Sequence, residues 1–148
     1  MTPETLTAYL HKEVPLTAAM QIRVLACTPH SVEIGAPLQP NINLHGTAFA
    51  GSLATLGLIS GWTLLNAALR DAKIEAHLVA QKSECTFHAP GTDALRATAK
   101  LPPKEWAQFL SALQSKGRAR LTVVTEVRTA DTLAVTHTGT YAAKLRAC

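Results

Sequence analysis

The segment at residues 41–53, NINLHGTAFAGSL, gathers uncharged polar side chains and glycines directly before the most apolar run of the sequence. Its histidine, His45, can take a proton from water near neutral pH. Asn41 and Asn43 can orient a water molecule or hold a carbonyl group. No Asp or Glu occurs at positions 38–70, so the chemistry predicted for these groups is attack of an activated water on a neutral carbonyl compound.

The same segment predicts where a helix begins. Thr47 is a natural N-cap, and the free N–H groups of the residues at positions 48–51 can then polarise a carbonyl oxygen. Gly46 and Gly51 let a ligand or another backbone segment approach without a Cβ in the way, although both can equally serve only to turn the chain. Ser52 lacks the G-x-S-x-G frame of a nucleophile elbow, so we assign it to packing or to a hydrogen bond with a ligand.

Residues 49–69, FAGSLATLGLISGWTLLNAAL, predict a long helix without a charged side chain. Its length would permit a membrane span, and Gly57 with Gly61 forms a GxxxG pair. Polar residues interrupt the run, however, and no cluster of basic residues flanks either end beyond Arg70. We therefore predict a buried core helix whose glycines admit a close neighbour, and no membrane span.

Strands account for most of the remaining sequence. A short amphipathic helix is expected near the N-terminus, where Pro3 suits the first turn and Pro15 should end it. A second short helix is expected at residues 102–117, with Trp106 on its apolar face. Alternating apolar and polar residues predict strands at positions 20–28, 31–38, 75–88, 94–101, 118–128 and 132–146. One apolar helix with about six antiparallel strands indicates an α+β fold, a curved sheet wrapped around the helix, in a single domain at residues 1–148.

Composition excludes several classes of protein. Cys27, Cys85 and Cys148 lie far apart and form no CxxC pair, which argues against a disulfide framework or a zinc site. The N-terminus, MTPETLTAYL, is not typical of a secretion signal, so we expect a cytoplasmic protein. The net charge of +4 comes from scattered basic residues and does not indicate nucleic acid binding. No metal or cofactor is expected, because the histidines show no ligand spacing.

Three strings of residues are similar to a known family. NINLHGTAFAGSLATLGLISGWTLL, FHAP and KGRARLTVVTEV resemble the thioesterase-like domain of the hotdog superfamily that is often fused behind a GNAT-type acetyltransferase. The resemblance covers nearly the whole chain, which would be a stand-alone version of that domain. It implies a hotdog fold, in which a sheet wraps a long central helix, assembled as a dimer or a dimer of dimers. It also implies acyl thioesters of coenzyme A or acyl carrier protein as ligands, with a neighbouring subunit completing the site.

The functional prediction combines the resemblance with the residues. We predict hydrolysis of acyl thioesters by water activated at the helix mouth, with a preference for aliphatic acyl groups. The catalytic candidates are His45, Asn43 and Asn41, and the substrate-binding candidates are Gly46, Thr47, Gly51, Ser52, Ser83 and Glu84. Thr86 and His88, on the same strand as Ser83, are further possible contributors. The alternative is a non-catalytic acyl-thioester-binding or oligomerisation module, which the missing carboxylate favours. A dehydratase is disfavoured, because that chemistry needs a histidine and an acid on this loop and helix.

Overall fold

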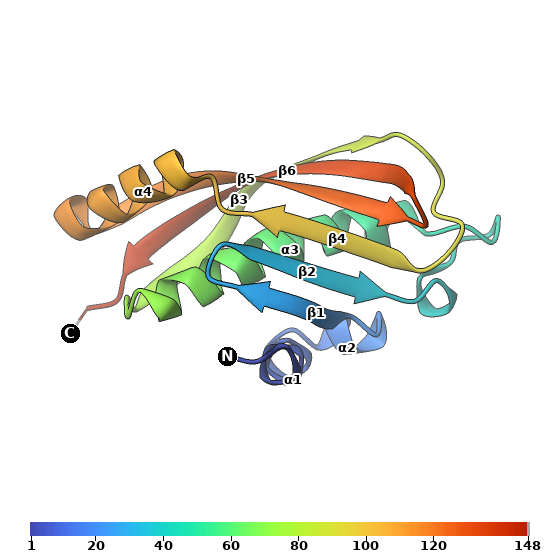
Figure 1. The fold of residues 1–148 in the computed structure, drawn as a ribbon, viewed down its shortest axis with the longest axis horizontal. Helices are drawn as coiled ribbons and strands as arrows, with labels where there is room; N and C mark the ends of the chain where they lie inside the picture. The colour runs from blue at the N-terminus through green and yellow to red at the C-terminus, as the bar shows by residue number, and fades with distance from the viewer. Residues whose placement is uncertain (148) are drawn as a thin grey trace.

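The computed structural model describes residues 1–147, and in it a six-stranded antiparallel sheet curves around one long helix (Figure 1). The predicted α+β class is confirmed. Across the sheet the strands follow the order β1-β2-β4-β5-β6-β3. In chain order the elements are α1 (Pro3–Glu13), α2 (Pro15–Ala19), β1 (Arg23–Thr28), β2 (Ser31–Ala36), the 3-10 turn η1 (Gln39–Asn41), α3 (Ala50–Asp71), β3 (Ala76–Phe87), β4 (Leu95–Lys100), α4 (Pro103–Lys116), β5 (Arg118–Thr129) and β6 (Thr132–Leu145).

Helix α3 forms the centre of the core, and its glycines permit a close approach of β6. A Cβ at Gly57 would lie 2.5 Å from the Cβ of His137, and one at Gly61 would meet the Tyr141 ring. The Tyr141 hydroxyl donates a hydrogen bond of 2.8 Å to the carbonyl oxygen of Leu58. The prediction that these glycines admit a close neighbour is confirmed, and that neighbour is a strand.

Length and composition alone would allow α3 to cross a membrane. Of its most apolar 18-residue window, however, 61% is buried inside the protein. Apolar residues such as Leu56, Leu64 and Leu65 are almost fully buried against the sheet. The helix is therefore apolar on most sides because it is a core helix.

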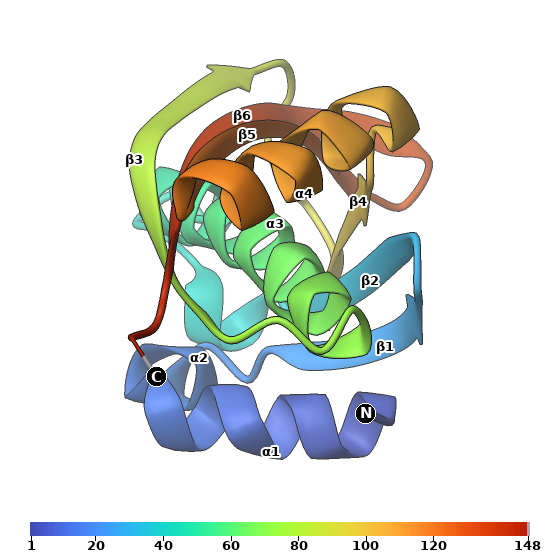
Figure 2. The same cartoon turned by 90° about the vertical axis from the view of Figure 1, so that its left-hand side faces the viewer.

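The two edges of the sheet differ. At the β1 edge, the backbone N–H of Val24 donates to the Thr7 hydroxyl at 2.9 Å, and His11 Nε2 bonds the carbonyl of Ile22 at 2.7 Å. Helix α1 therefore covers the free edge of β1 (Figure 2). At the other edge, β3 pairs with β6 along one side, and most of its twelve residues are exposed.

Two predictions for the first strand and its approach need correction. Pro15 ends the first helix as predicted, but it also begins the short helix α2, which the sequence did not reveal. The alternation predicted for this strand placed Ala26 on the buried face, whereas Ala26 is exposed. The register shifts between Val24 and Ala26, so the extra residue Leu25 reverses the facing of the later residues of the strand.

Candidate functional site

The loop that leads into α3 is fastened from behind by Asn41. This side chain is 2% exposed, and its Nδ2 donates to the carbonyl oxygens of Met20 at 3.0 Å and Pro37 at 2.8 Å. Its backbone carbonyl accepts a bond of 2.7 Å from the N–H of Phe49. Asn41 thus braces the loop against the preceding elements, and its amide group faces the protein interior.

Asn43 organises the turn in front of the helix. Its Oδ1 accepts from the backbone N–H groups of His45 at 2.8 Å and Thr47 at 3.2 Å. Its Nδ2 donates to the Thr47 hydroxyl at 3.0 Å. The turn also needs Gly46, whose φ of +76° is a backbone conformation that glycine adopts readily. The loop is therefore preformed by its own side chains.

The start of α3 differs from the prediction. The N-cap is Phe49, which makes no capping bond with its side chain, so the assignment of Thr47 as the cap is wrong. The Thr47 hydroxyl is instead occupied by Asn43. The ring of Phe49 lies over Gly51, where a Cβ would clash with it. Of the donors predicted at positions 48–51, the N–H groups of Ala48 and Phe49 are occupied by the carbonyl oxygens of Gly91 and Asn41. The N–H groups in the first turn of α3 have no intrahelical acceptor, and no side chain caps them.

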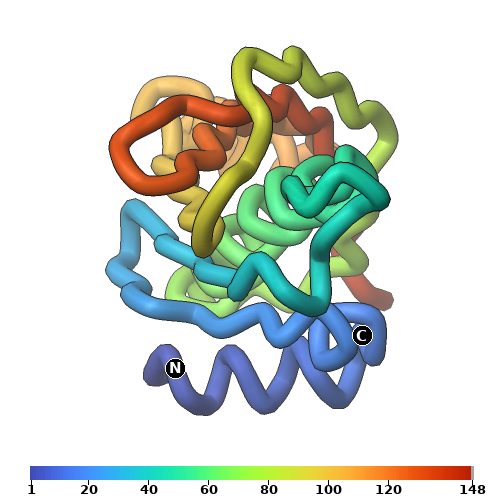
Figure 3. Tube along the Cα trace, turned by 90° about the vertical axis from the view of Figure 1, so that its right-hand side faces the viewer, coloured from blue at the N-terminus to red at the C-terminus, as the bar shows by residue number. Residues whose placement is uncertain are grey.

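A hollow of about 390 Å³ opens beside this helix start, at the end of the molecule that faces the viewer in Figure 3. Its wall combines the loop, the first turn of α3 and the segment after β3. The lining residues are Asn43, Thr47, Ala48, Ala50, Leu53, Phe87, His88, Ala89 and Pro90. We call it the mouth hollow. It contains polar groups from two segments but no carboxylate, which suits a neutral, partly apolar ligand.

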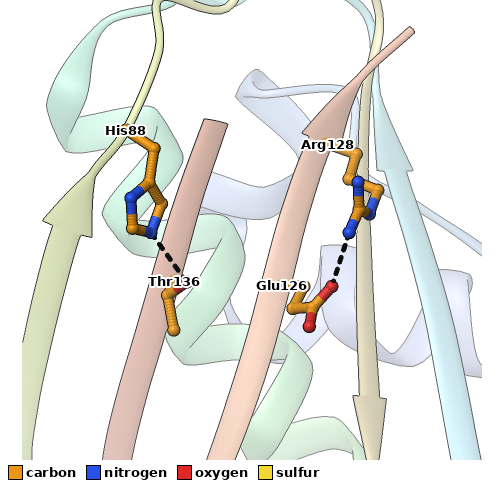
Figure 4. A network of polar contacts seen from close by, with 4 residues as sticks. All are labelled: His88, Glu126, Arg128 and Thr136. Carbon is orange, nitrogen blue, oxygen red and sulfur yellow. Dashed lines mark hydrogen bonds and ion pairs between the residues drawn. The ribbon is translucent and has the colours of Figure 1, made fainter. Parts of the chain in front are cut away.

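His88, one of the possible contributors that the sequence offered on the strand at 75–88, lines the mouth hollow. Its Nε2 lies 2.9 Å from the hydroxyl of Thr136 on β6 (Figure 4). On the same sheet face, Thr136 lies opposite Glu126, which forms an ion pair of 3.0 Å with Arg128. His88 directly follows β3, and residues at the ends of strands commonly contribute to functional sites.

The structure does not bring all of the predicted residues to this hollow. His45 is exposed in the turn and is not part of the hollow's lining. Gly51 and Ser52 lie in the first turn of α3, outside the lining residues. Glu84 is exposed on β3 and pairs with Lys82 at 3.0 Å.

Ser83 has a different partner, His137, which lies under α3. The Ser83 hydroxyl is 2.7 Å from His137 Nε2, and the His137 side chain has no exposed surface. Burial lowers the pKa of the His137 imidazole below its ordinary value, because a buried ring is costly to charge. His137 lacks metal-ligand spacing in the sequence and was not predicted as a site residue.

Known proteins share both the sequence pattern and the fold. The model of a family described as putative thioesterase (yiiD_Cterm) matches residues 3–145. The chain belongs to this family. The crystal structure of the putative thioesterase from Shewanella oneidensis is 28% identical and has a TM-score of 0.86, with 97% of each chain covered. The family resemblance and the hotdog fold are therefore confirmed.

Two further members of the hotdog structural group share the fold at lower identity. A Pseudomonas aeruginosa protein described as a probable thioesterase is 18% identical, with a TM-score of 0.84 and 97% of each chain covered. A thioesterase from Haemophilus influenzae is 14% identical, with a TM-score of 0.76 over 98% of this chain and 92% of that chain. At these identities the similarity shows that the two proteins have the same fold as this chain, and nothing more.

Proposed function

We propose that this protein hydrolyses acyl thioesters at the mouth hollow. The observation that carries the proposal is the uncapped start of α3 beside a hollow whose polar groups are uncharged. Free N–H groups at a helix start stabilise the oxyanion that forms when water attacks a thioester carbonyl. Removing one well-aimed donor of this kind typically costs about a hundredfold to a thousandfold in rate.

A histidine at the mouth takes the proton from the attacking water. The sequence predicts His45, at the exposed turn, and the hollow offers His88 on its opposite wall. Asn43 and Asn41 then act by holding the loop, because their side chains are bonded within the protein. The proton passes from water to imidazole, the hydroxide attacks the carbonyl carbon, and the thiolate leaves as the C–S bond breaks.

The acyl group extends along apolar surface. Ala48, Ala50, Leu53 and Phe87 supply most of that surface in the hollow. Each methylene of an aliphatic chain that it covers contributes about 0.8 kcal/mol at most, so uncharged chains are preferred. The carrier in our proposal is coenzyme A or acyl carrier protein, and the setting is the cytoplasm.

We further propose a homodimer, in which a second copy pairs with β3. The strand is long and exposed, and its Val79 and Phe87 side chains are 57% and 51% exposed. An unpaired edge of this kind is a template for another strand. The partner then covers apolar surface beside the mouth hollow and completes its wall.

Release of free thiol from a panel of acyl-CoAs tests the proposed activity. We expect turnover of octanoyl-CoA well above that of succinyl-CoA, because the hollow carries apolar surface and no cation. Equal rates would contradict the aliphatic preference. Tight binding without thiol release would favour the alternative, a non-catalytic acyl-thioester-binding module, which the lack of a carboxylate in the hollow supports.

A pair of histidine variants tests the base. The variant that removes the base should lose about a hundredfold in kcat or more, and its rate should no longer rise across the pH range in which histidines deprotonate. His45→Ala and His88→Ala are compared under the same conditions, each with its oligomeric state. If both variants keep a normal kcat and pH profile, the histidine mechanism is wrong.

A further inference from the structure

A second hollow lies at the opposite end of the sheet, on its outer face, and it is strongly basic. Its volume is about 530 Å³, and it is lined by His77, Val79, Gln81, Arg118, Ala119, Arg120, Ala142, Ala143 and Lys144. The strand register explains the clustering: His77 on β3 lies opposite Lys144 on β6, which lies opposite Arg118 on β5. We call it the basic hollow; Figure 2 looks onto this end of the molecule.

The next set of cross-strand neighbours makes the hollow deep. Val79, Ala142 and Arg120 occupy matched positions on β3, β6 and β5. Ala142 has a short side chain, so the space between the longer neighbours stays open. An adjoining hollow adds Lys116 and Arg146 to the cations at this end.

The cations of the basic hollow are not neutralised. Among the residues that the structure describes, no carboxylate lines this hollow, and none of the four ion pairs includes Arg118, Arg120 or Lys144. Like charges brought together without a counter-ion destabilise a fold, so such a cluster indicates a ligand that supplies negative charge. Arginine and lysine side chains together are suited to phosphate oxygens.

A larger hollow on the same sheet face provides the contrast. It has a volume of about 830 Å³ and also contains arginines, including Arg96 and Arg128. Arg96 pairs with Glu33 at 2.8 Å and Arg128 with Glu126 at 3.0 Å. Asp93 and Asp131 also line it. Two of the three arginines that line the larger hollow are thus paired with carboxylates, whereas Arg118 and Arg120 of the basic hollow are in none of the four ion pairs.

We propose that the basic hollow binds the phosphate groups of a nucleotide, and that it serves the mouth of the partner subunit. This inference rests on the proposed thioesterase function for its second half. In that function the nucleotide is the phosphorylated end of a coenzyme A thioester, whose acyl end enters the mouth hollow.

Strand geometry explains why the two hollows serve different subunits. Within one protomer they lie at opposite ends of β3, from His77 to Phe87, which is about 33 Å of extended chain. When two copies of an edge strand pair antiparallel about a two-fold axis, the start of each strand lies beside the end of the other. The His77 end of one copy then lies next to the Phe87 end of its partner.

Calorimetric titration of the intact protein with coenzyme A and with adenosine 3′,5′-bisphosphate tests the phosphate site. We expect both probes to bind, with affinity falling as salt is raised. The double variant Arg118→Gln and Arg120→Gln should weaken binding at least tenfold. The matched control, Arg96→Gln and Arg128→Gln, should stay within twofold of wild type. Absence of binding, or an equal loss in the control, overturns the proposal.

A thioester without phosphates separates this inference from the proposed function. The Arg118 and Arg120 variant should raise KM for octanoyl-CoA about tenfold and leave kcat and the hydrolysis of octanoyl-N-acetylcysteamine unchanged. If the short thioester is hydrolysed but coenzyme A does not bind, the phosphate site is wrong and the function stands. If nucleotide binding depends on these arginines but no thioester is cleaved, the function is wrong and the site stands.

Mixed dimers test the assignment to the partner. Subunits with a defective basic hollow are combined with subunits whose mouth is inactivated by whichever histidine variant abolishes turnover. In our arrangement one of the two sites then has an intact mouth and an intact basic hollow, so the activity of the mixed dimer, measured at octanoyl-CoA concentrations below the wild-type KM, should recover to about half of the wild-type value. Recovery no greater than that of the separate variants would place both hollows in the same subunit.

Discussion

The two edge strands of the sheet differ in what covers them: β1 is covered by a helix, and β3 is exposed. At β1, side chains of α1 bond the strand backbone, with Thr7 accepting from Val24 and His11 bonding Ile22. At β3, no helix among residues 1–147 takes that place, and the strand exposes residues along both faces. An exposed edge of this length is a liability in a monomer unless another strand covers it. This contrast supports our proposal that a second copy pairs with β3, because α1 already occupies the other edge.

The walls of the mouth hollow connect to both edges of the sheet. On one side its loop is braced through Asn41 to Met20, just before β1. On the other side its wall is Phe87 and His88, at the end of the bare strand β3. One wall is therefore fixed by the subunit itself, and in the proposed dimer the other wall lies where the second copy pairs with β3.

The largest effect is expected from a proline on the bare edge. Gln81 is the extra residue at the register shift in β3 and has no partner on β6. Gln81→Pro should therefore keep the β3–β6 ladder but block pairing with a second copy, because proline lacks an N–H and crowds the edge. We expect a folded monomer by sedimentation and a loss of thioesterase activity of about a hundredfold or more.

The matched control lies on the other edge strand. Leu25 is likewise the extra residue at the register shift in β1. Leu25→Pro should lower the unfolding free energy, since the Leu25 side chain also covers Gly35, but the protein should stay dimeric. A Leu25→Pro protein that turned monomeric while Gln81→Pro stayed dimeric would reverse the comparison of the two edges.

A smaller effect is expected from loosening the covered edge. Thr7→Val has nearly the same shape but leaves the N–H of Val24 without its acceptor. An unpaired backbone donor that is partly buried costs about 1–3 kcal/mol. Urea unfolding should show this loss, with the oligomeric state and the KM for octanoyl-CoA unchanged. Thr122→Val is the control, because that hydroxyl bonds Thr140 on the exposed sheet face; a similar loss there would mean that edge capping is not the cause.

Much of the fold could be predicted, because the spacing of apolar residues and the local composition indicate the helices and strands. The charge-free run predicted α3, and alternation predicted the strands, with Leu121 and Val123 buried as expected. The register shift at Leu25 could not be predicted, since one extra residue reverses the facing without changing the composition. Covering of one edge by α1 also depends on tertiary placement of Thr7, which looks like any helical threonine.

The site was harder to predict than the fold. The segment at 41–53 was correctly located at the start of α3. Its polar side chains, however, form hydrogen bonds within the protein: Asn43 donates to the Thr47 hydroxyl, and Asn41 donates to the carbonyl oxygen of Met20. Side-chain hydrogen bonds of this kind compete with capping and cannot be ranked from spacing alone. His88 and His137 come from segments distant in sequence, so only the strand register reveals their neighbours.

The smallest effect concerns pH and acts on the β3 side alone. Burial lowers the pKa of His137 below its ordinary value, so below about pH 6.5 the unfolded chain binds more protons at this ring than the folded protein does. The unfolding free energy is therefore unaffected above about pH 6.5 and decreases as pH falls below it, by at most about 1.4 kcal/mol per pH unit. His137→Gln should flatten this slope, whereas His30→Gln, which removes an exposed histidine, should not. Because the His137 ring bonds Ser83, hydrogen exchange at pH 5 should accelerate more in β3 than in β1. Equal acceleration at both edges would show that the acid sensitivity does not come from His137.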